Sequence, residues 1–175
     1  SIGPLTFVFT GSGNVSQGAQ EVFRELPMEF VKPEHLAKVA QQGSSKKVYG
    51  CVVDMADNLV RKSDGKFEME DYFKHPEKYA STFATEYAPY TSVIINGIYF
   101  APGAPRFINT QDCKSLLRPQ RTPWLPSSEG CPHLPHRLMA ICDISADPGG
   151  SIEIVKECTT IDHPFQLYNA LEDTS

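Results

Sequence analysis

Residues 5–19 have the sequence LTFVFTGSGNVSQGA, in which an apolar run is followed by a glycine turn and a helical pattern. The run Leu5–Phe9 is rich in aromatic and β-branched residues and is short enough for one buried strand. Beyond Gly11-Ser12-Gly13, apolar side chains recur at helical spacing, at Val15, Ala19, Val22, Phe23 and Leu26. This spacing predicts a helix with one apolar face. A strand, a glycine turn and a helix in this order are typical of a dinucleotide-binding fold.

The glycine turn has features that suit a pyrophosphate. Its first glycine allows a tight turn, its second lets a phosphate approach the backbone, and the N–H groups of the helix N-terminus face the ligand. The spacing departs from G-x-G-x-x-G, because Ser16 stands where the third glycine would be and Gly18 follows two residues later. The flanking strand and helix favour a nucleotide-binding turn over a turn that only joins the two elements.

Length and composition predict one globular domain spanning residues 1–175. The chain is 41% hydrophobic, which is enough for a core. A net charge of −5 without a basic stripe argues against a nucleic-acid partner. No apolar run approaches the roughly 20 residues of a membrane span. The chain begins with Ser1 instead of Met and ends in an acidic segment that closes no helix, and we expect it to be excised from a longer polypeptide.

Cysteine and acidic residues do not predict a disulfide framework or a metal site. Five cysteines at irregular spacing indicate reduced thiols. Cys131, His133 and His136 form a C-x-H-x-x-H pattern, but a structural zinc needs a second pair of ligands, and none follows at suitable spacing. The acidic group within residues 68–71 is interpreted as a solvated helix face. We therefore expect no metal.

The remaining pattern predicts an α/β fold of the Rossmann-like class, with a mostly parallel sheet and helices on both faces. Further strands are expected at 28–31, 47–53, 90–96, 137–142 and 151–155. Shorter helices are expected at 34–42, 69–73 and 110–117, the last with Thr110 as its N-cap. The polar segment 54–89 is too long for an ordinary crossover and is interpreted as an insertion. Residues 118–135 are expected to form a loop.

The ends of the predicted strands supply further candidate ligand contacts. In open α/β sheets, ligands bind beyond the carboxyl ends of the strands, where Asn96, Tyr99 and Asp143 fall. Asp147, before Pro-Gly-Gly, is interpreted as a turn residue. The end of the second strand is expected to reach the adenosine ribose, where a cation suits the 2′-phosphate of NADP and an acid suits NAD. Lys32 favours NADP, although a solvated lysine and NAD both stay possible.

Several blocks of the sequence resemble the lysine–2-oxoglutarate reductases, the lysine-forming saccharopine dehydrogenases found as one portion of bifunctional enzymes. They span nearly the whole chain in one order and comprise residues 9–21, 90–92, 95–99, 130–132, 141–147, 149–153 and 160–165. The resemblance implies a fold related to alanine dehydrogenase and transhydrogenase, with two Rossmann-like lobes around the active site. This chain would be the nucleotide-binding lobe.

The resemblance also implies roles for individual residues. The pyrophosphate would be held by Gly11, Ser12, Gly13, Asn14 and Val15. The ribose would lie near Val31 and Lys32, and Tyr99 would pack along the cofactor. The nicotinamide side would be flanked by Cys142, Asp143, Ile144 and Ser145. The lysine and histidine that move protons in this family belong to the other lobe, so no catalytic residue is expected in this chain.

The implied reaction condenses L-lysine with 2-oxoglutarate and reduces the imine with NADPH to saccharopine, the first step of lysine degradation in the mitochondrial matrix. Both substrates would bind through the missing lobe, and the full-length form is expected to be a homo-oligomer. Two alternatives stay open. One is a non-catalytic Rossmann-like nucleotide-binding or assembly module. The other is an S-adenosylmethionine-dependent methyltransferase, although Thr10 stands where such enzymes carry an acidic residue.

Overall fold

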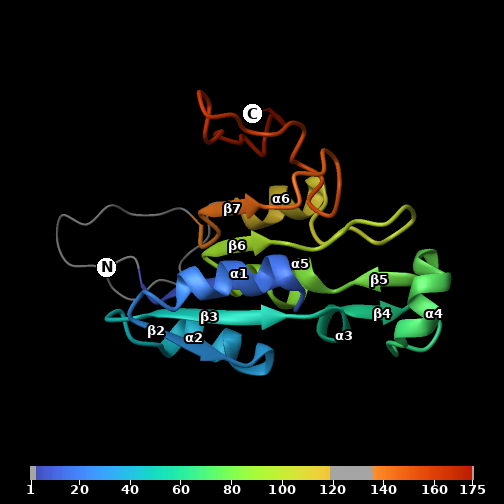
Figure 1. The fold of residues 1–175 in the computed structure, drawn as a ribbon, viewed down its shortest axis with the longest axis horizontal. Coiled ribbons are helices and arrows are strands. Elements are labelled where there is room, and N and C mark those ends of the chain that lie inside the picture. The colour runs from blue at the N-terminus through green and yellow to red at the C-terminus, as the bar shows by residue number, and fades with distance from the viewer. Residues whose placement is uncertain (1–2, 119–135, 175) are drawn as a thin grey trace.

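The computed structural model describes residues 3–118 and 136–174, which fold around a central parallel sheet (Figure 1). Its five strands lie in the order β2-β3-β1-β6-β7, and every pair is parallel. The predicted Rossmann-like α/β class is therefore confirmed. The strands are β1 Leu5–Thr10, β2 Met28–Val31, β3 Val48–Val53, β6 Val93–Asn96 and β7 Ala140–Asp143.

The position of β2 differs from the expected arrangement. In the common dinucleotide-binding order, the second strand of the chain lies beside the first. Here β2 pairs with β3 alone at the edge of the sheet, and β3 is the neighbour of β1. On its other side β1 pairs with β6, so the chain changes direction across the sheet between β1 and β6. Ligands of open α/β sheets bind at such a point, beyond the carboxyl ends of the strands.

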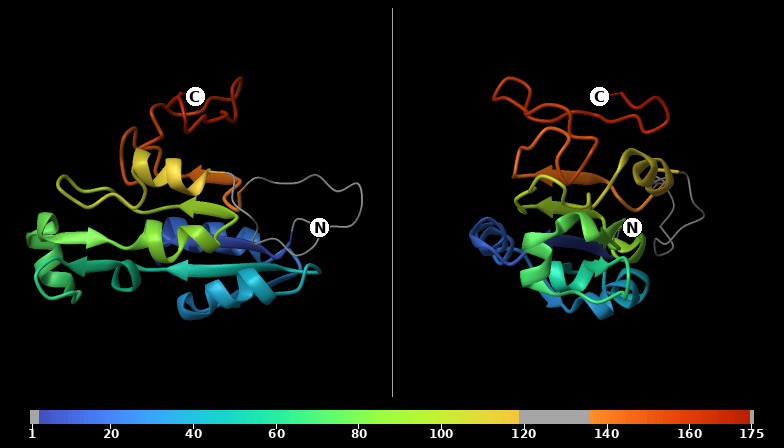
Figure 2. Two further views of the ribbon diagram at one scale, coloured as in Figure 1. Left: turned by 180° about the vertical axis from the view of Figure 1, so that it is seen from behind. Right: turned by 90° about the vertical axis from the view of Figure 1, so that its right-hand side faces the viewer.

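Helices cover both faces of the sheet, with α1 on one face and α6 on the other (Figure 2). The helix predicted after the glycine turn forms, and so do the shorter predicted helices that follow β2 and β6. The helices outside the β4–β5 hairpin, which is described below, are α1 Asn14–Phe23, η1 Pro33–His35, α2 Leu36–Gln42, α5 Phe83–Glu86, η3 Ala88–Tyr90 and α6 Thr110–Leu116.

The predicted apolar face of α1 is wrong except at Phe23. The side chains of Val15, Val22 and Leu26 are 47%, 74% and 47% exposed. The buried residues of α1 are instead Ser16, Gln20 and Phe23. The Phe23 ring sets this rotation, because it lies 5.1–5.5 Å from the rings of Phe7, Phe9 and Phe30. Gln20 Nε2 donates to Ser16 Oγ (3.1 Å), so the two buried polar side chains satisfy each other.

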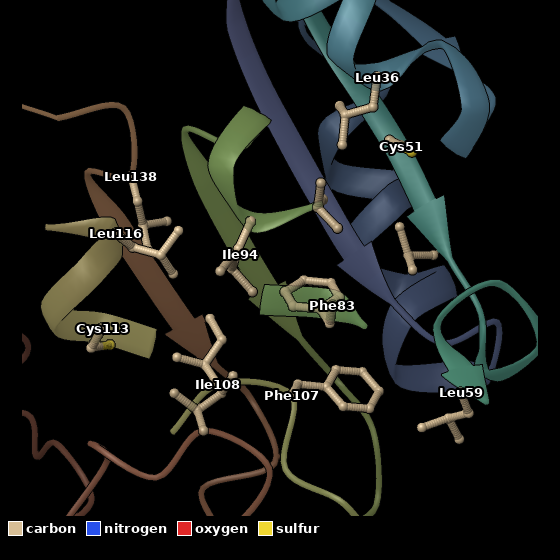
Figure 3. Close-up of a cluster of buried hydrophobic side chains, with 14 of the residues drawn as sticks. Leu36, Cys51, Leu59, Phe83, Ile94, Phe107, Ile108, Cys113, Leu116 and Leu138 are labelled. Atoms are coloured by element: carbon tan, nitrogen blue, oxygen red, sulfur yellow. The ribbon is translucent and has the colours of Figure 1, made fainter. Parts of the chain in front are cut away.

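The opposite face of the sheet carries the main hydrophobic core (Figure 3). Val8, Cys51 and Ile94 are paired in register on three adjacent strands, and all three are fully buried. Leu36 covers them from α2, Phe83 from α5 and Leu116 from α6. Burying each large apolar side chain contributes about 1.5–3 kcal/mol, so this face holds the sheet and three helices together.

The connection from β3 to β6 leaves the carboxyl edge of the sheet as an antiparallel hairpin (Figure 1). Arg61 organises it, with its guanidinium 2.8 Å from Glu68 Oε2 and 3.2 Å from Asp71 Oδ2. Glu68 and Asp71 are therefore ion-paired with Arg61. The interpretation of residues 54–89 as an insertion stays a prediction. The hairpin comprises α3 Met55–Asn58, β4 Leu59–Arg61, α4 Met69–Lys74, η2 Pro76–Lys78 and β5 Tyr79–Ser81.

Two local predictions between residues 109 and 155 are wrong. The N-cap of α6 is Asn109, whose side chain accepts from the Asp112 N–H, while Thr110 donates from N and Oγ1 to Glu153 Oε2. Residues 151–155 form no strand beyond a single bridge from Ile152 to Ile108. Glu153 connects the two regions, because its carboxylate accepts both hydrogen bonds from Thr110 at the start of α6.

Two of the cysteines are placed to resist modification. Cys51 and Cys113 are fully buried, and burial raises the pKa of each thiol to about 12. At pH 8 only roughly one molecule in 10⁴ would carry the reactive thiolate at either position. We expect iodoacetamide to label the exposed Cys142 and Cys158 and to spare Cys51 and Cys113 until urea unfolds the chain. Peptide mass spectrometry measures this, and rapid labelling of Cys51 in native protein would contradict the packing.

Candidate functional site

The glycine turn lies at the carboxyl end of β1 and leads directly into α1. Gly11 has φ +75°, a conformation that L side chains rarely adopt, and its N–H donates to the Val53 carbonyl (2.9 Å). Gly13 is the N-cap of α1, and no side chain in the described residues caps that end. A Cβ added to Gly13 would meet nothing within 4 Å. The space beside the Gly13 Cα is therefore open, and uncapped N–H groups at a helix start suit an anion.

The end of β6 approaches this turn closely. A Cβ added to Gly97 would lie 2.9 Å from Val15 Cγ1 and 3.4 Å from the Ser16 N. Glycine at position 97 is what allows the backbone after β6 to pack against the start of α1. Tyr99 follows two residues later and is 80% exposed.

Asp54 lies at the end of β3, the strand that neighbours β1. Its Oδ2 accepts a hydrogen bond from Ser12 Oγ (2.7 Å), and its Oδ1 accepts from the Met55 N–H (2.8 Å) as the N-cap of α3. The end of the strand beside β1 is where dinucleotide folds place the residue that meets the adenosine ribose. Sequence reasoning assigned that place to Lys32, whereas the strand order puts Lys32 one strand further from the glycine turn.

Asn96 joins the ends of three strands. It is fully buried at the end of β6. Its Oδ1 accepts from Thr10 Oγ1 (2.7 Å), and its Nδ2 donates to Asp143 Oδ1 (2.8 Å) and Ser151 Oγ (2.9 Å). The Gly97 N–H in turn donates to Thr10 Oγ1 (3.1 Å). These hydrogen bonds link the ends of β1, β6 and β7 and fix them relative to one another.

Most of the predicted site residues therefore gather at one edge of the sheet. Residues 11–15 follow β1, Tyr99 follows β6, and residues 142–145 form the end of β7 and the turn after it. Three apolar side chains remain exposed there, namely Val15, Tyr99 and Ile144. A cavity of about 210 Å³ lies at the opposite edge, against the starts of β1 and β3, and is separate from these residues. The contacts that each predicted residue makes with a ligand stay predictions.

Neither a metal site nor a membrane-spanning helix is found in the described residues. No group of three histidine, cysteine, aspartate or glutamate side chains within 3–118 and 136–174 could hold a metal ion. In the C-x-H-x-x-H pattern, Cys131 and His133 lie outside the described residues, and His136 Nδ1 lies 2.7 Å from the Leu138 carbonyl. None of the described helices is long and apolar enough to cross a bilayer.

Comparison with known proteins finds close relatives, although no family model matches the chain. The chain is 57% identical to mitochondrial alpha-aminoadipic semialdehyde synthase of Bos taurus and 56% identical to that of Mus musculus, over 97% of its length. It is 40% identical to alpha-aminoadipic semialdehyde synthase of Arabidopsis thaliana over 95% of its length. It spans only 18%, 18% and 15% of these proteins. Over nearly all of its length, the chain is thus similar to one segment of the alpha-aminoadipic semialdehyde synthases.

Proposed function

We propose that this chain is the nucleotide-binding lobe of an NADPH-dependent lysine–2-oxoglutarate reductase. The observation that supports this most directly is the N-terminus of α1, which no side chain of the described residues caps and which lies beside the end of β6, where the chain changes direction across the sheet. The resemblance in sequence to the reductases supports the same reaction. L-Lysine and 2-oxoglutarate would condense to an imine, and its reduction would give saccharopine.

The residues present fit a dinucleotide. The N–H groups that begin α1 would bind the pyrophosphate, and the open space at Gly13 would admit it. Tyr99 and Ile144, both exposed, would cover the rings. When bound, NADPH supplies a hydride, and the protein supplies orientation and electrostatics. In the whole protein, a second lobe would close over the carboxyl edge and exclude water that hydrolyses the imine.

The choice between NADPH and NADH depends on the charges near the adenosine ribose. Asp54 would accept a hydrogen bond from the 2′-hydroxyl of NADH and would repel the 2′-phosphate of NADPH, whereas Lys32 would attract that phosphate. Lys32 is exposed at the end of the neighbouring edge strand. We propose NADPH as the coenzyme, supported by the resemblance and by Lys32, with Asp54 opposing it.

Asp54→Asn is expected to shift the ratio of the two dissociation constants towards NADPH by about tenfold, because a charge-assisted contact to NADH and a repulsion of NADPH are lost together. Fluorescence titration of the full-length protein with NADPH and NADH measures both constants. Asp64→Asn, in the hairpin turn, serves as the control and is expected to leave the ratio unchanged. An unchanged ratio in Asp54→Asn would place the ribose elsewhere.

The reaction itself is tested by incubating the full-length protein with L-lysine, 2-oxoglutarate and NADPH and following saccharopine by mass spectrometry. Saccharopine formation that requires all three compounds is the expected result. NADPH binding without turnover would instead favour the non-catalytic module, and stabilisation by S-adenosylmethionine alone would favour the methyltransferase. The names of the mammalian relatives include the mitochondrion, and we propose the mitochondrial matrix for this protein as well.

A further inference from the structure

The segment that follows residue 155 exposes several large apolar side chains. It lies beyond β7 and forms no helix and only one isolated bridge within residues 156–174 (Figures 1 and 2). Single exposed apolar residues are ordinary on a protein surface, whereas several close together mark an interaction site. The exposed fractions are 99%, 78%, 87% and 80% for Ile161, Phe165, Leu167 and Leu171.

The end of this segment is anchored to the domain. Ala170 is buried, and Tyr168 packs against the main hydrophobic core. The Tyr168 hydroxyl donates to Asp173 Oδ1 (2.9 Å), and Lys156 Nζ lies 3.1 Å from the same oxygen. The exposed side chains before Tyr168 therefore do not belong to a detached tail. They stand on a stretch of chain with one side against its own domain.

Residues 164–168 present their apolar side chains on the other side. This stretch runs without helix, turn or bend, and side chains two residues apart in an extended chain share a side. Gln166 Nε2 donates to Glu157 Oε1 (2.7 Å), and Tyr168 contacts the core, so these two face their own domain. Phe165 and Leu167 consequently face away from it. In the described part of the chain, no backbone group of residues 164–168 is hydrogen-bonded to another backbone group.

The charges of the segment add a second requirement for a partner. Lys156 is ion-paired with Asp173. The remaining carboxylates of the segment, at Glu157, Asp162 and Glu172, form no ion pair with any of the described residues. An apolar surface bordered by lysine or arginine side chains would complement both the exposed apolar side chains and these carboxylates.

We propose that residues 161–167 dock on a part of the same polypeptide outside these 175 residues, with Phe165 and Leu167 in apolar pockets bordered by basic side chains. The chain spans only 18% of its bovine relative, so most of such a protein is available as the partner. A surface on the same polypeptide is held at high effective concentration, which favours it over a separate molecule. Extended segments bind in this way through their backbone groups and alternate side chains. The proposal is independent of the coenzyme and the reaction.

Photo-crosslinking of the full-length protein tests this contact, with p-benzoylphenylalanine in place of Phe165 or of Leu167. We expect both positions to link to peptides from outside residues 1–175, in molecules that keep the mass of one chain on a denaturing gel. Mass spectrometry should find apolar residues beside lysine or arginine in those peptides. Gln166 is the matched control, because it lies between the two and faces its own domain. The same photoreactive residue there should lose the outside links and react within residues 1–175, near Glu157.

Each other outcome contradicts the proposal. Linked species of twice the mass would make the partner a second copy of the protein. Links confined to residues 1–175, or none, from positions 165 and 167 would leave the segment folded back or in water. Equal capture of the outside peptides from position 166 would remove the sidedness of the contact.

Hydrogen exchange of the unsubstituted full-length protein gives a second readout that needs no bulky side chain. The amides of residues 165–168, unpaired with backbone groups of the described chain, should exchange at least about tenfold more slowly than in an unstructured peptide, because docking would protect them. Exchange at the rate of an unstructured peptide would overturn the docking.

Discussion

Gly13→Val is expected to weaken dinucleotide binding about 100-fold and to change the free energy of unfolding by no more than about 1 kcal/mol. Gly13 has φ −74°, which any residue can adopt, and an added Cβ meets nothing within 4 Å. The larger side chain would instead fill the space in front of the first N–H groups of α1. Two lost hydrogen bonds to a charged phosphate account for the expected factor. Titration with NADPH and thermal unfolding of the same full-length preparation measure the two effects.

Gly18→Ala is the matched control for this prediction. Gly18 is exposed within the same helix, and a Cβ there also meets nothing within 4 Å. Alanine in a helix interior stabilises by about 0.5–1 kcal/mol relative to glycine, so this variant should melt at a higher temperature and bind NADPH as wild type does. Equal affinities for Gly13→Val and Gly18→Ala would remove the pyrophosphate from the glycine turn.

The local elements of the fold follow from the sequence because their causes are local. The run Leu5–Phe9 and the turn after it predict β1 and the start of α1, and Gly43 follows directly on α2. The face of α1 could not be predicted in the same way. Val15 and Val22 fit a helical stripe, yet Phe23 decides the rotation by joining rings from two strands, and those strands are distant in the sequence.

For the candidate site too, the local elements could be predicted, and their arrangement in the sheet could not. Its glycine turn and strand ends were located from the pattern of apolar runs, but the place of Asp54 was missed. The sequence orders the strands along the chain, whereas the ribose position depends on which strand is hydrogen-bonded to β1. Asp54 follows an apolar run and forms a capping box with Asp57, which is a pattern that can be recognised in the sequence. The pairing of β3 with β1 cannot be recognised there.

The contact between Asn96 and Asp143 is a further property that no local pattern reveals. Asn96 is 47 residues away from Asp143 in the sequence, and Ser151 lies beyond a turn. Asn96 and Asp143 meet because β6 and β7 pair with Asn96 opposite Asp143. The chemistry of the site therefore depends on register, which is fixed by the packing of the whole sheet.

Phe83→Ala is expected to destabilise the fold by about 3–5 kcal/mol, the largest change in stability that we predict. Phe83 is fully buried in α5, and its ring stacks on Phe107 with centroids 5.3 Å apart and planes at 23°. It belongs to the core beneath the sheet, where it links the return from the β4–β5 hairpin to the segment before α6. A loss of this size is a large part of the 5–15 kcal/mol that stabilises a typical domain.

Native-state hydrogen exchange of the β1 and β6 amides measures this loss in the full-length protein, because those amides exchange only when this sheet opens. Phe73→Ala is the control. It makes the same change in α4 of the hairpin, at a side chain that is 66% exposed, and should alter the exchange free energy by no more than about 0.5 kcal/mol. If both variants accelerated exchange equally, the hairpin would open as one unit and Phe83 would not join it to the sheet. If only Phe83→Ala does so, the hairpin is anchored through α5, and the carboxyl edge that bears Asp54 and Asn96 depends on that anchor.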